Sequence, residues 1–138
     1  MIQSSLSFIY KAIRKINLSI KRPIHQFTTF FLLYFNQVKF SSFKSNGIPY
    51  IMIARGGKCT VGRNFSMHNA NYNPIGRQQR CILIVDKNAS LKIGKNVGIS
   101  GTAIITHKKI TIGYYVKIGG NVCIYDTDFH SLNPEIRK

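Results

Sequence analysis

His130 stands in a short segment that concentrates side chains able to do chemistry. The segment runs Asp126-Thr127-Asp128-Phe129-His130-Ser131-Leu132-Asn133-Pro134-Glu135-Ile136-Arg137. A free imidazole titrates at about pH 6.5, so a neutral histidine can accept a proton near neutral pH and return it later. The segment therefore carries groups suited to acid–base chemistry, with carboxylates close in sequence to an imidazole.

The charge balance excludes chemistry that needs several carboxylates. The chain has 138 residues, with 20 Lys and Arg against 4 Asp and Glu, for a formal net charge of +16. The acidic residues are Asp86, Asp126, Asp128 and Glu135. A glycosidase pair or a two-metal site is not expected from so few carboxylates. The high apolar fraction, 44%, indicates one folded domain of ordinary size rather than a disordered chain.

The cysteines and the apolar runs bear on the compartment. Cys59, Cys81 and Cys123 follow neither a disulfide framework nor a metal-ligand spacing, so we expect a reducing compartment and no metal. The longest apolar run, 27–35, is far shorter than the roughly 20 residues that cross a membrane. Basic residues interrupt the stretch where the apolar region of a secretory signal peptide would lie. We expect a cytoplasmic protein, with any membrane contact at the inner face.

The first 46 residues form a basic segment with a helical pattern. Residues 1–22 carry apolar side chains three or four apart, at Leu6, Ile9, Ile13, Ile16 and Ile20, and the basic side chains Lys11, Arg14, Lys15, Lys21 and Arg22 lie off that stripe. This spacing predicts an amphipathic helix that ends at Pro23, followed by a second helix over about 24–38. Two roles stay open for the first helix: packing on the body of the protein, or lying on an anionic membrane. Nucleic-acid binding is not expected, because no recognition motif accompanies the charge.

A six-residue repeat occupies the second half of the chain. Isoleucine opens six successive hexapeptides, at 93, 99, 105, 112, 118 and 124, with one extra residue, Thr111, between the third and fourth. The same signature occurs at 61–65 and 85–89, and we predict a long surface loop between Met67 and Arg80. Such a period fits a triangular coil with one short strand per side, a tight turn at each corner and the isoleucines stacked inside. We therefore predict a mainly β, parallel solenoid over 47–138.

These repeats resemble the hexapeptide-repeat, left-handed β-helix family of acyltransferases. The resemblance implies a left-handed winding, which is an exception to the usual right-handed rule for parallel strands. It also implies a homotrimer, in which three prisms pack around a threefold axis and the active sites lie between neighbouring subunits.

The segment after the last repeat resembles the histidine segment of maltose, galactoside and nodulation-type O-acetyltransferases and of polysaccharide-pathway sugar acetyltransferases. The matching residues are His130, Leu132, Asn133, Pro134 and Arg137. Ser131 stands where those enzymes often have proline, and Asn133 stands where aspartate is common. The resemblance implies that His130 is the general base, which takes a proton from a hydroxyl attacking the thioester of acetyl-CoA.

Other residues of the segment keep two interpretations. Asp126 and Asp128 could orient the imidazole or bind a sugar hydroxyl, or they could be solvated loop carboxylates. Arg137 could bind substrate or only hold the loop. We interpret His25, His68 and His107 as surface or hydrogen-bonded residues, and we assign no residues to acetyl-CoA binding. A three-histidine zinc site, which some members of this fold hold, is not expected from this spacing.

The resemblance implies an acetyl-CoA-dependent O-acetyltransferase that acts on a sugar or polysaccharide precursor. Two other functions stay open, a truncated non-catalytic β-helix protein and a basic surface-binding module. Resembling enzymes continue for several coils beyond the histidine loop, and those coils supply much of the acetyl-CoA groove. We therefore expect C-terminal coils to be missing here, and little activity from the chain as given.

Overall fold

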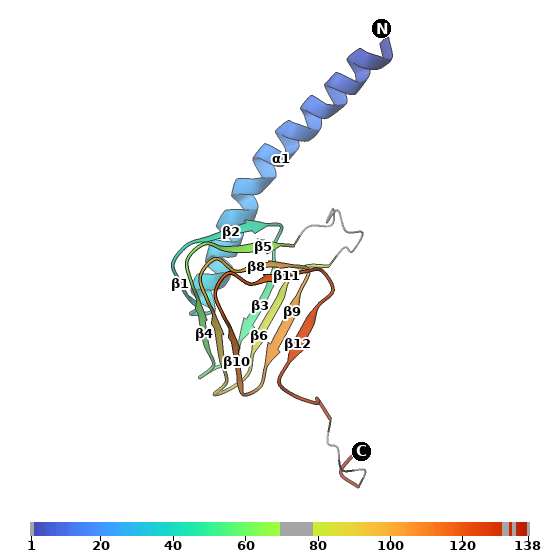
Figure 1. Cartoon of the computed structure of the whole chain (residues 1–138). Helices are drawn as coiled ribbons and strands as arrows, with labels where there is room; N and C mark the ends of the chain where they lie inside the picture. Colours follow the sequence, from blue (N-terminus) through green and yellow to red (C-terminus); the bar gives the residue numbers. More distant parts are fainter. Residues whose placement is uncertain (1, 70–78, 131–132, 134, 138) are drawn as a thin grey trace.

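One long helix and three parallel sheets make up the part of the chain that the computed structural model describes, residues 2–69, 79–130, 133 and 135–137 (Figure 1). The helix is α1 (Ile2–Phe35). The strands are β1 (Lys39–Phe40), β2 (Phe43–Asn46), β3 (Tyr50–Ile53), β4 (Lys58–Val61), β5 (Phe65–His68), β6 (Ile82–Val85), β7 (Ser90–Ile93), β8 (Gly98–Ser100), β9 (Ala103–Thr106), β10 (Lys109–Ile112), β11 (Lys117–Ile118) and β12 (Cys123–Tyr125).

The chain visits the three sheets in rotation. Sheet A has the order β1-β4-β7-β10, sheet B the order β11-β8-β5-β2, and sheet C the order β12-β9-β6-β3. Every strand pairs in parallel with the strand three places later, so three consecutive strands form one circuit and four circuits lie against one another. The fold is mainly β with parallel strands, which is consistent with the parallel β-helix that the repeats predict.

Apolar side chains stack inside the circuits. In sheet A, Cys59, Leu91 and Ile110 lie in register, and all three are buried. In sheet C, Leu83 and Ile104 are in register and fully buried. Fully burying a side chain of this size contributes about 1.5–3 kcal/mol, so these stacks are the main apolar stabilisation of the sheets.

We call the turns from sheet A to sheet B, 41–42, 62–64, 94–97 and 113–116, the A–B edge. The last three begin in the same way, with Gly62-Arg63-Asn64, Gly94-Lys95-Asn96 and Gly113-Tyr114-Tyr115. The third residue is left-handed each time, with φ of 57° at Asn64, 59° at Asn96 and 61° at Tyr115. A Cβ at Gly62 would lie 2.7 Å from the carbonyl carbon of Gly94 on the next circuit. The close stacking of circuits therefore requires glycine at that position.

The repeat frame needs one correction. The hexapeptide frame predicts that Ile105 points inside, but Ile104 and Thr106 are the fully buried residues of β9, and Ile105 lies on the outer side of sheet C. The side chains of a strand alternate between its two faces, and Ile104 is in register with the buried Leu83. The frame therefore slips before β9, rather than at Thr111.

The two predicted helices are a single helix of 34 residues that runs through Pro23. Proline lacks the N–H that an α-helix needs, so the prediction of a break was reasonable but wrong. Contacts with the sheets hold the residues just after it. The Gln26 side chain donates to the Phe43 carbonyl (2.9 Å) and accepts from the Ser45 N–H (2.9 Å), and the Gly47 N–H donates to Nδ1 of His25 (3.1 Å).

The first circuit was not recognised in the sequence. It begins at β1, so the boundary placed at residue 46 falls inside the first circuit, and residues 36–46 belong with the sheets. The predicted helix over 24–38 ends at Phe35. Met67 and His68 are part of β5, while residues 70–78 of the predicted surface loop lie outside the described residues.

Candidate functional site

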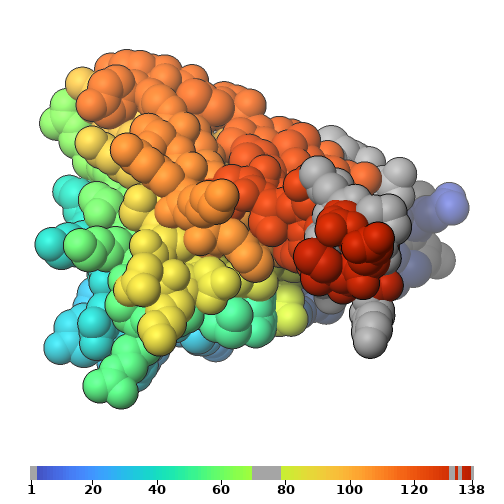
Figure 2. Space-filling view, turned by 90° about the horizontal axis from the view of Figure 1, so that it is seen from below, coloured from blue at the N-terminus to red at the C-terminus, as the bar shows by residue number. Residues whose placement is uncertain are grey.

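The segment with His130 follows the last strand of sheet C. We call the turns that lead from sheet C to sheet A, 54–57, 86–89 and 107–108, together with 126–130, the C–A edge. Seen from below, successive circuits form green, yellow and orange bands along this edge, with the C-terminal residues in red beside them (Figure 2). Three of the four acidic residues, Asp86, Asp126 and Asp128, belong to this edge of a very basic chain.

Asp126 holds the shortest turn of the C–A edge. Its carboxylate accepts hydrogen bonds from the backbone N–H groups of His107 (2.5 Å), Lys108 (2.9 Å) and Lys109 (2.6 Å). Partial burial raises the pKa of Asp126, but these N–H donors outweigh it and lower the pKa overall. The turn at 107–108 has two residues, whereas 54–57 and 86–89 have four each. The Asp126 carboxylate therefore supports this shortened turn by binding the turn's backbone N–H groups.

Beside this corner lies an aspartate–histidine pair that sequence reasoning missed. Nδ1 of His107 is 3.5 Å from Oδ2 of Asp86, and the two side chains are 37% and 50% exposed. Val85 and Thr106 are in register, so the residues that follow them meet on neighbouring turns. The repeat does carry the signal that Asp86 and His107 are equivalent positions. A hexapeptide frame with Ile105 inside is shifted by one residue, so it does not place the two side by side.

Phe129 connects the segment of His130 to this pair. Its ring meets the ring of His107 edge-on, with centroids 5.6 Å apart, and meets the ring of Tyr125 edge-on at 5.0 Å. Phe129 has a φ of 61°, the left-handed region that bulky residues rarely adopt. The two aromatic contacts hold it there, and they fix where the next residue, His130, leaves the sheets.

The imidazole of His130 itself is exposed. The His130 backbone N–H donates to the carbonyl oxygen of Asp128 (2.7 Å). Within the described part of the chain, no hydrogen bond or ion pair engages its ring, so the imidazole is open to a ligand. The structure does not bring Asp126 or Arg137 into contact with it.

The rest of the predicted motif is described in part. Asn133 begins a turn, because its side-chain oxygen accepts from the Glu135 N–H (3.0 Å) and its carbonyl accepts from the Ile136 N–H (3.2 Å). Arg137 is exposed. Ser131, Leu132 and Pro134 lie outside the described residues.

The outer faces of sheets A and C differ in chemistry. The outward positions of sheet C are apolar or aromatic on all four strands: Tyr50, Met52, Ile82, Ile84, Ala103, Ile105, Cys123 and Tyr125. The outward positions of sheet A carry Lys39, Lys58, Thr60, Ser90, Lys92, Lys109 and Thr111. We call these the apolar face and the lysine face. The apolar face reaches the C–A edge at Tyr125.

Two grooves lie on the polar outer face of sheet B. One, of about 380 Å³, is lined by residues that include Lys44, Asn96 and Lys117. The other, of about 530 Å³, lies between α1 and sheet B, and its lining includes Arg22 and His68. No residue of the C–A edge lines either groove. Among the described residues, no three His, Cys, Asp or Glu side chains gather as a metal site would require.

Comparison of the chain with models of protein families, with curated proteins and with solved structures gives no match.

Proposed function

We propose that the chain is an acetyltransferase of the left-handed β-helix type, which moves an acetyl group from acetyl-CoA to a hydroxyl group of a sugar or polysaccharide precursor. One observation carries the proposal: an exposed histidine follows the last strand of sheet C, at an edge of three parallel sheets with hexapeptide repeats. The resemblance of the segment from His130 to Arg137 to sugar O-acetyltransferases supports the same reaction.

In this reaction the imidazole of His130 takes the proton of the acceptor hydroxyl. The oxygen then attacks the carbonyl carbon of the thioester, and the tetrahedral intermediate collapses with cleavage of the carbon–sulfur bond. The imidazolium returns the proton to the thiolate of coenzyme A, so the histidine ends as it began. His107 is a positioning residue, because it acts on His130 only through the ring of Phe129.

The apolar face supports self-association as a homotrimer. Copies that each carry a formal charge of +16 repel one another, so a stable contact needs a surface without like charges. The apolar face has no charged residue at its outward positions, and it ends at the C–A edge. A trimer built through it places the histidine segment at the border between subunits.

We place the reaction in the cytoplasm. Cys59, Cys81 and Cys123 are free thiols, which fits a reducing compartment. In the described part of the chain, no helix combines the length and apolarity needed to cross a membrane.

The reaction is tested by incubating the full chain with acetyl-CoA and a panel of sugars. Release of the coenzyme A thiol is followed with time, and acetylated products are identified by mass spectrometry. Because the coils that supply much of the acetyl-CoA groove are expected to be missing, we expect slow thiol release that still depends on at least one hydroxyl acceptor and exceeds simple hydrolysis. Folded protein that releases no thiol with any acceptor would contradict the proposal and favour the non-catalytic alternative.

The oligomer is tested separately by light scattering at micromolar concentration. We expect a trimer for the natural chain, a monomer for Ile84→Glu on the apolar face, and a trimer for the matched control Thr60→Glu on the lysine face. A monomeric natural chain, or equal effects of the two substitutions, would contradict association through the apolar face.

A further inference from the structure

Helix α1 contacts the sheets over its C-terminal part only. It packs on β1 and β2, and Thr29 and Leu33 on that side are fully buried. The ring of Phe30 meets that of Phe40 edge-on at 5.8 Å. The N-terminal part extends beyond the sheets, so that the N-terminal end lies far from them (Figure 1). At 1.5 Å per residue the whole helix is about 50 Å long.

The apolar stripe of α1 lies on the side opposite to this contact. Two residues along a helix correspond to about half a turn, so Phe27 and Phe31 are opposite the buried Thr29 and Leu33. The same side continues to the N-terminus through residues three or four apart. They are each 52–66% exposed: Leu6, Ile9, Ile13, Ile16, Ile20, Ile24, Phe27 and Tyr34. Of the two roles left open for the first helix, packing on the body therefore does not account for this stripe.

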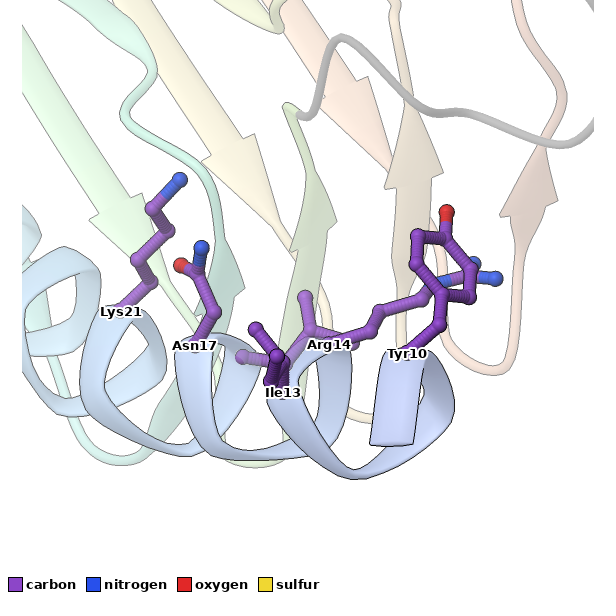
Figure 3. Close-up of a pocket in the computed structure, with 6 residues that line it drawn as sticks. Tyr10, Ile13, Arg14, Asn17 and Lys21 are labelled. Carbon is purple, nitrogen blue, oxygen red and sulfur yellow. The ribbon is translucent and has the colours of Figure 1, made fainter. Parts of the chain in front are cut away.

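The five Lys and Arg side chains of α1 lie off the stripe, with Arg14 and Lys21 nearest to its edge, and no acidic residue precedes Asp86. On one border, Arg14, Asn17 and Lys21 point to the same side of the helix as the ring of Tyr10 (Figure 3). Together with Ile13 they line a shallow hollow of about 370 Å³ whose lining comes from α1 alone. Apolar and cationic groups therefore meet along the helix, as they do in helices that lie at a membrane–water boundary.

We propose that α1 lies flat on an anionic lipid bilayer, with its apolar stripe among the acyl chains and its Lys and Arg side chains at the headgroup phosphates. Because the stripe faces away from the sheets, this orientation keeps the three sheets on the water side without any rearrangement. The net positive charge adds attraction to the negative surface. This inference does not depend on the proposed reaction.

A second copy of the helix fits the stripe less well than a membrane does. The spacing of three and four residues would suit a coiled coil, but coiled coils commonly pair opposite charges beside the apolar seam. Helix α1 has five Lys and Arg residues and no Asp or Glu, so two copies bring only like charges together. Anionic lipid supplies the missing negative charge.

The proposal is tested by vesicle flotation with the full chain. We expect binding to vesicles of phosphatidylcholine with about one-third phosphatidylglycerol, at least about tenfold tighter than to phosphatidylcholine alone and weaker in high salt. Ile13→Asn with Ile16→Asn and Ile20→Asn should weaken binding at least about a hundredfold, because three buried apolar side chains are lost. The matched control places Leu at the same three positions and should bind like the natural chain.

A second pair of variants separates the helix from the overall charge. Lys11→Glu with Arg14→Glu and Lys15→Glu should release the protein. The same change of charge at Lys58, Lys92 and Lys109, on the lysine face, should weaken binding much less. Equal weakening by the two sets, equal binding of the Asn and Leu variants, or no binding by the natural chain would overturn the proposal.

Tryptophan fluorescence reports the depth of the stripe directly, because the chain contains no tryptophan. Ile13→Trp should shift to shorter wavelength on anionic vesicles and be quenched by brominated acyl chains, whereas Ser7→Trp, on the polar side of α1, should change little. Equal responses at the two positions would overturn the proposal. The proposal would also be overturned if the Asn substitutions in the stripe changed the oligomeric state in light scattering and left vesicle binding unchanged. A second copy of the helix would then cover the stripe.

Discussion

The A–B edge and the C–A edge are both stacks of turns, yet they differ in regularity. At the A–B edge, three successive circuits repeat a turn that begins with glycine and has a left-handed third residue. The C–A edge changes from four-residue turns to a two-residue turn and then to the segment of His130. Its side chains include the aspartate–histidine pair, whereas at the A–B edge Asn64 donates to Asn96 at 3.0 Å and Lys95 lies over the rings of Tyr114 and Tyr115. The proposed function assigns the chemistry to the irregular edge, and it gives the regular edge a part in stability only.

The strongest test of this difference is His130→Ala. It should lower kcat for the proposed acetyl transfer about 10²- to 10⁴-fold, because the hydroxyl would lose the general base that we propose. His130 is exposed, so no cavity forms and the circular dichroism spectrum should not change. His68→Ala, at an exposed histidine of sheet B, is the control and should keep full activity. A variant of His130 that retains more than a tenth of the natural kcat would remove it from the role of base.

Asp126→Asn should be the next largest change, and its effect is on stability. Three backbone donors hold the carboxylate, and hydrogen bonds to charged groups contribute more than neutral ones, so we expect a loss of about 1–2 kcal/mol at pH 7. The pKa of Asp126 is lowered in the fold, so this stabilisation is complete above the usual value of about 3.9 and is lost as pH falls through the lowered pKa.

Urea unfolding at pH 7 and at low pH measures this directly. The free energies of unfolding of the natural chain and of Asp126→Asn should converge as the solution is acidified. A difference that stays constant with pH would show that the carboxylate charge is not what holds the corner.

His107→Ala should reduce kcat by up to about tenfold, close to 1.4 kcal/mol, with little change in KM. The reason is indirect, since the Phe129 ring loses one of its two aromatic neighbours and His130 is positioned less well. His107→Phe keeps a ring at that position and should restore most of the activity. Failure of phenylalanine to restore it would give the imidazole of His107 a direct chemical part.

The smallest effect is expected at the A–B edge. Asn96→Ala should destabilise the fold by about 1 kcal/mol, because alanine is strained in the left-handed region and the bond from Asn64 is lost. Asn96→Gly relieves the backbone strain and should recover part of that free energy of unfolding. Neither change should alter kcat of the folded protein in the proposed reaction, and an altered kcat would contradict the distinction between the two edges.

The repeats predicted the interior because their spacing reports side-chain direction. Ile93, Ile99 and Ile112 are buried, as the hexapeptide frame requires, and the strands are parallel. The first circuit escaped notice because its inward positions include Phe43 and Ser45 rather than a run of aliphatic residues followed by glycine. The continuous helix escaped notice because the contacts that support it past Pro23 come from residues distant in sequence.

The sequence predicted individual residues of the candidate site, but not the contacts between them. The position of His130 after the last strand followed from the sequence, but its aromatic link to His107 depends on the left-handed backbone at Phe129. The pair of Asp86 and His107 depends on the exact register of two strands, and an error of one residue removes it from view. The local sequence pattern predicts which element a residue belongs to, but contacts between circuits can be predicted only when the register of neighbouring strands is known.

The three thiols differ in their exposure, and this has a consequence for chemical labelling. Burial raises the pKa of Cys59 to about 12 and also raises that of Cys81, so neither forms the reactive thiolate readily. Cys123 is exposed, and it lies on the apolar face. An alkylating reagent should therefore modify Cys123 first, and the rate would measure how completely the apolar face is covered in the proposed trimer, without any substitution in the chain.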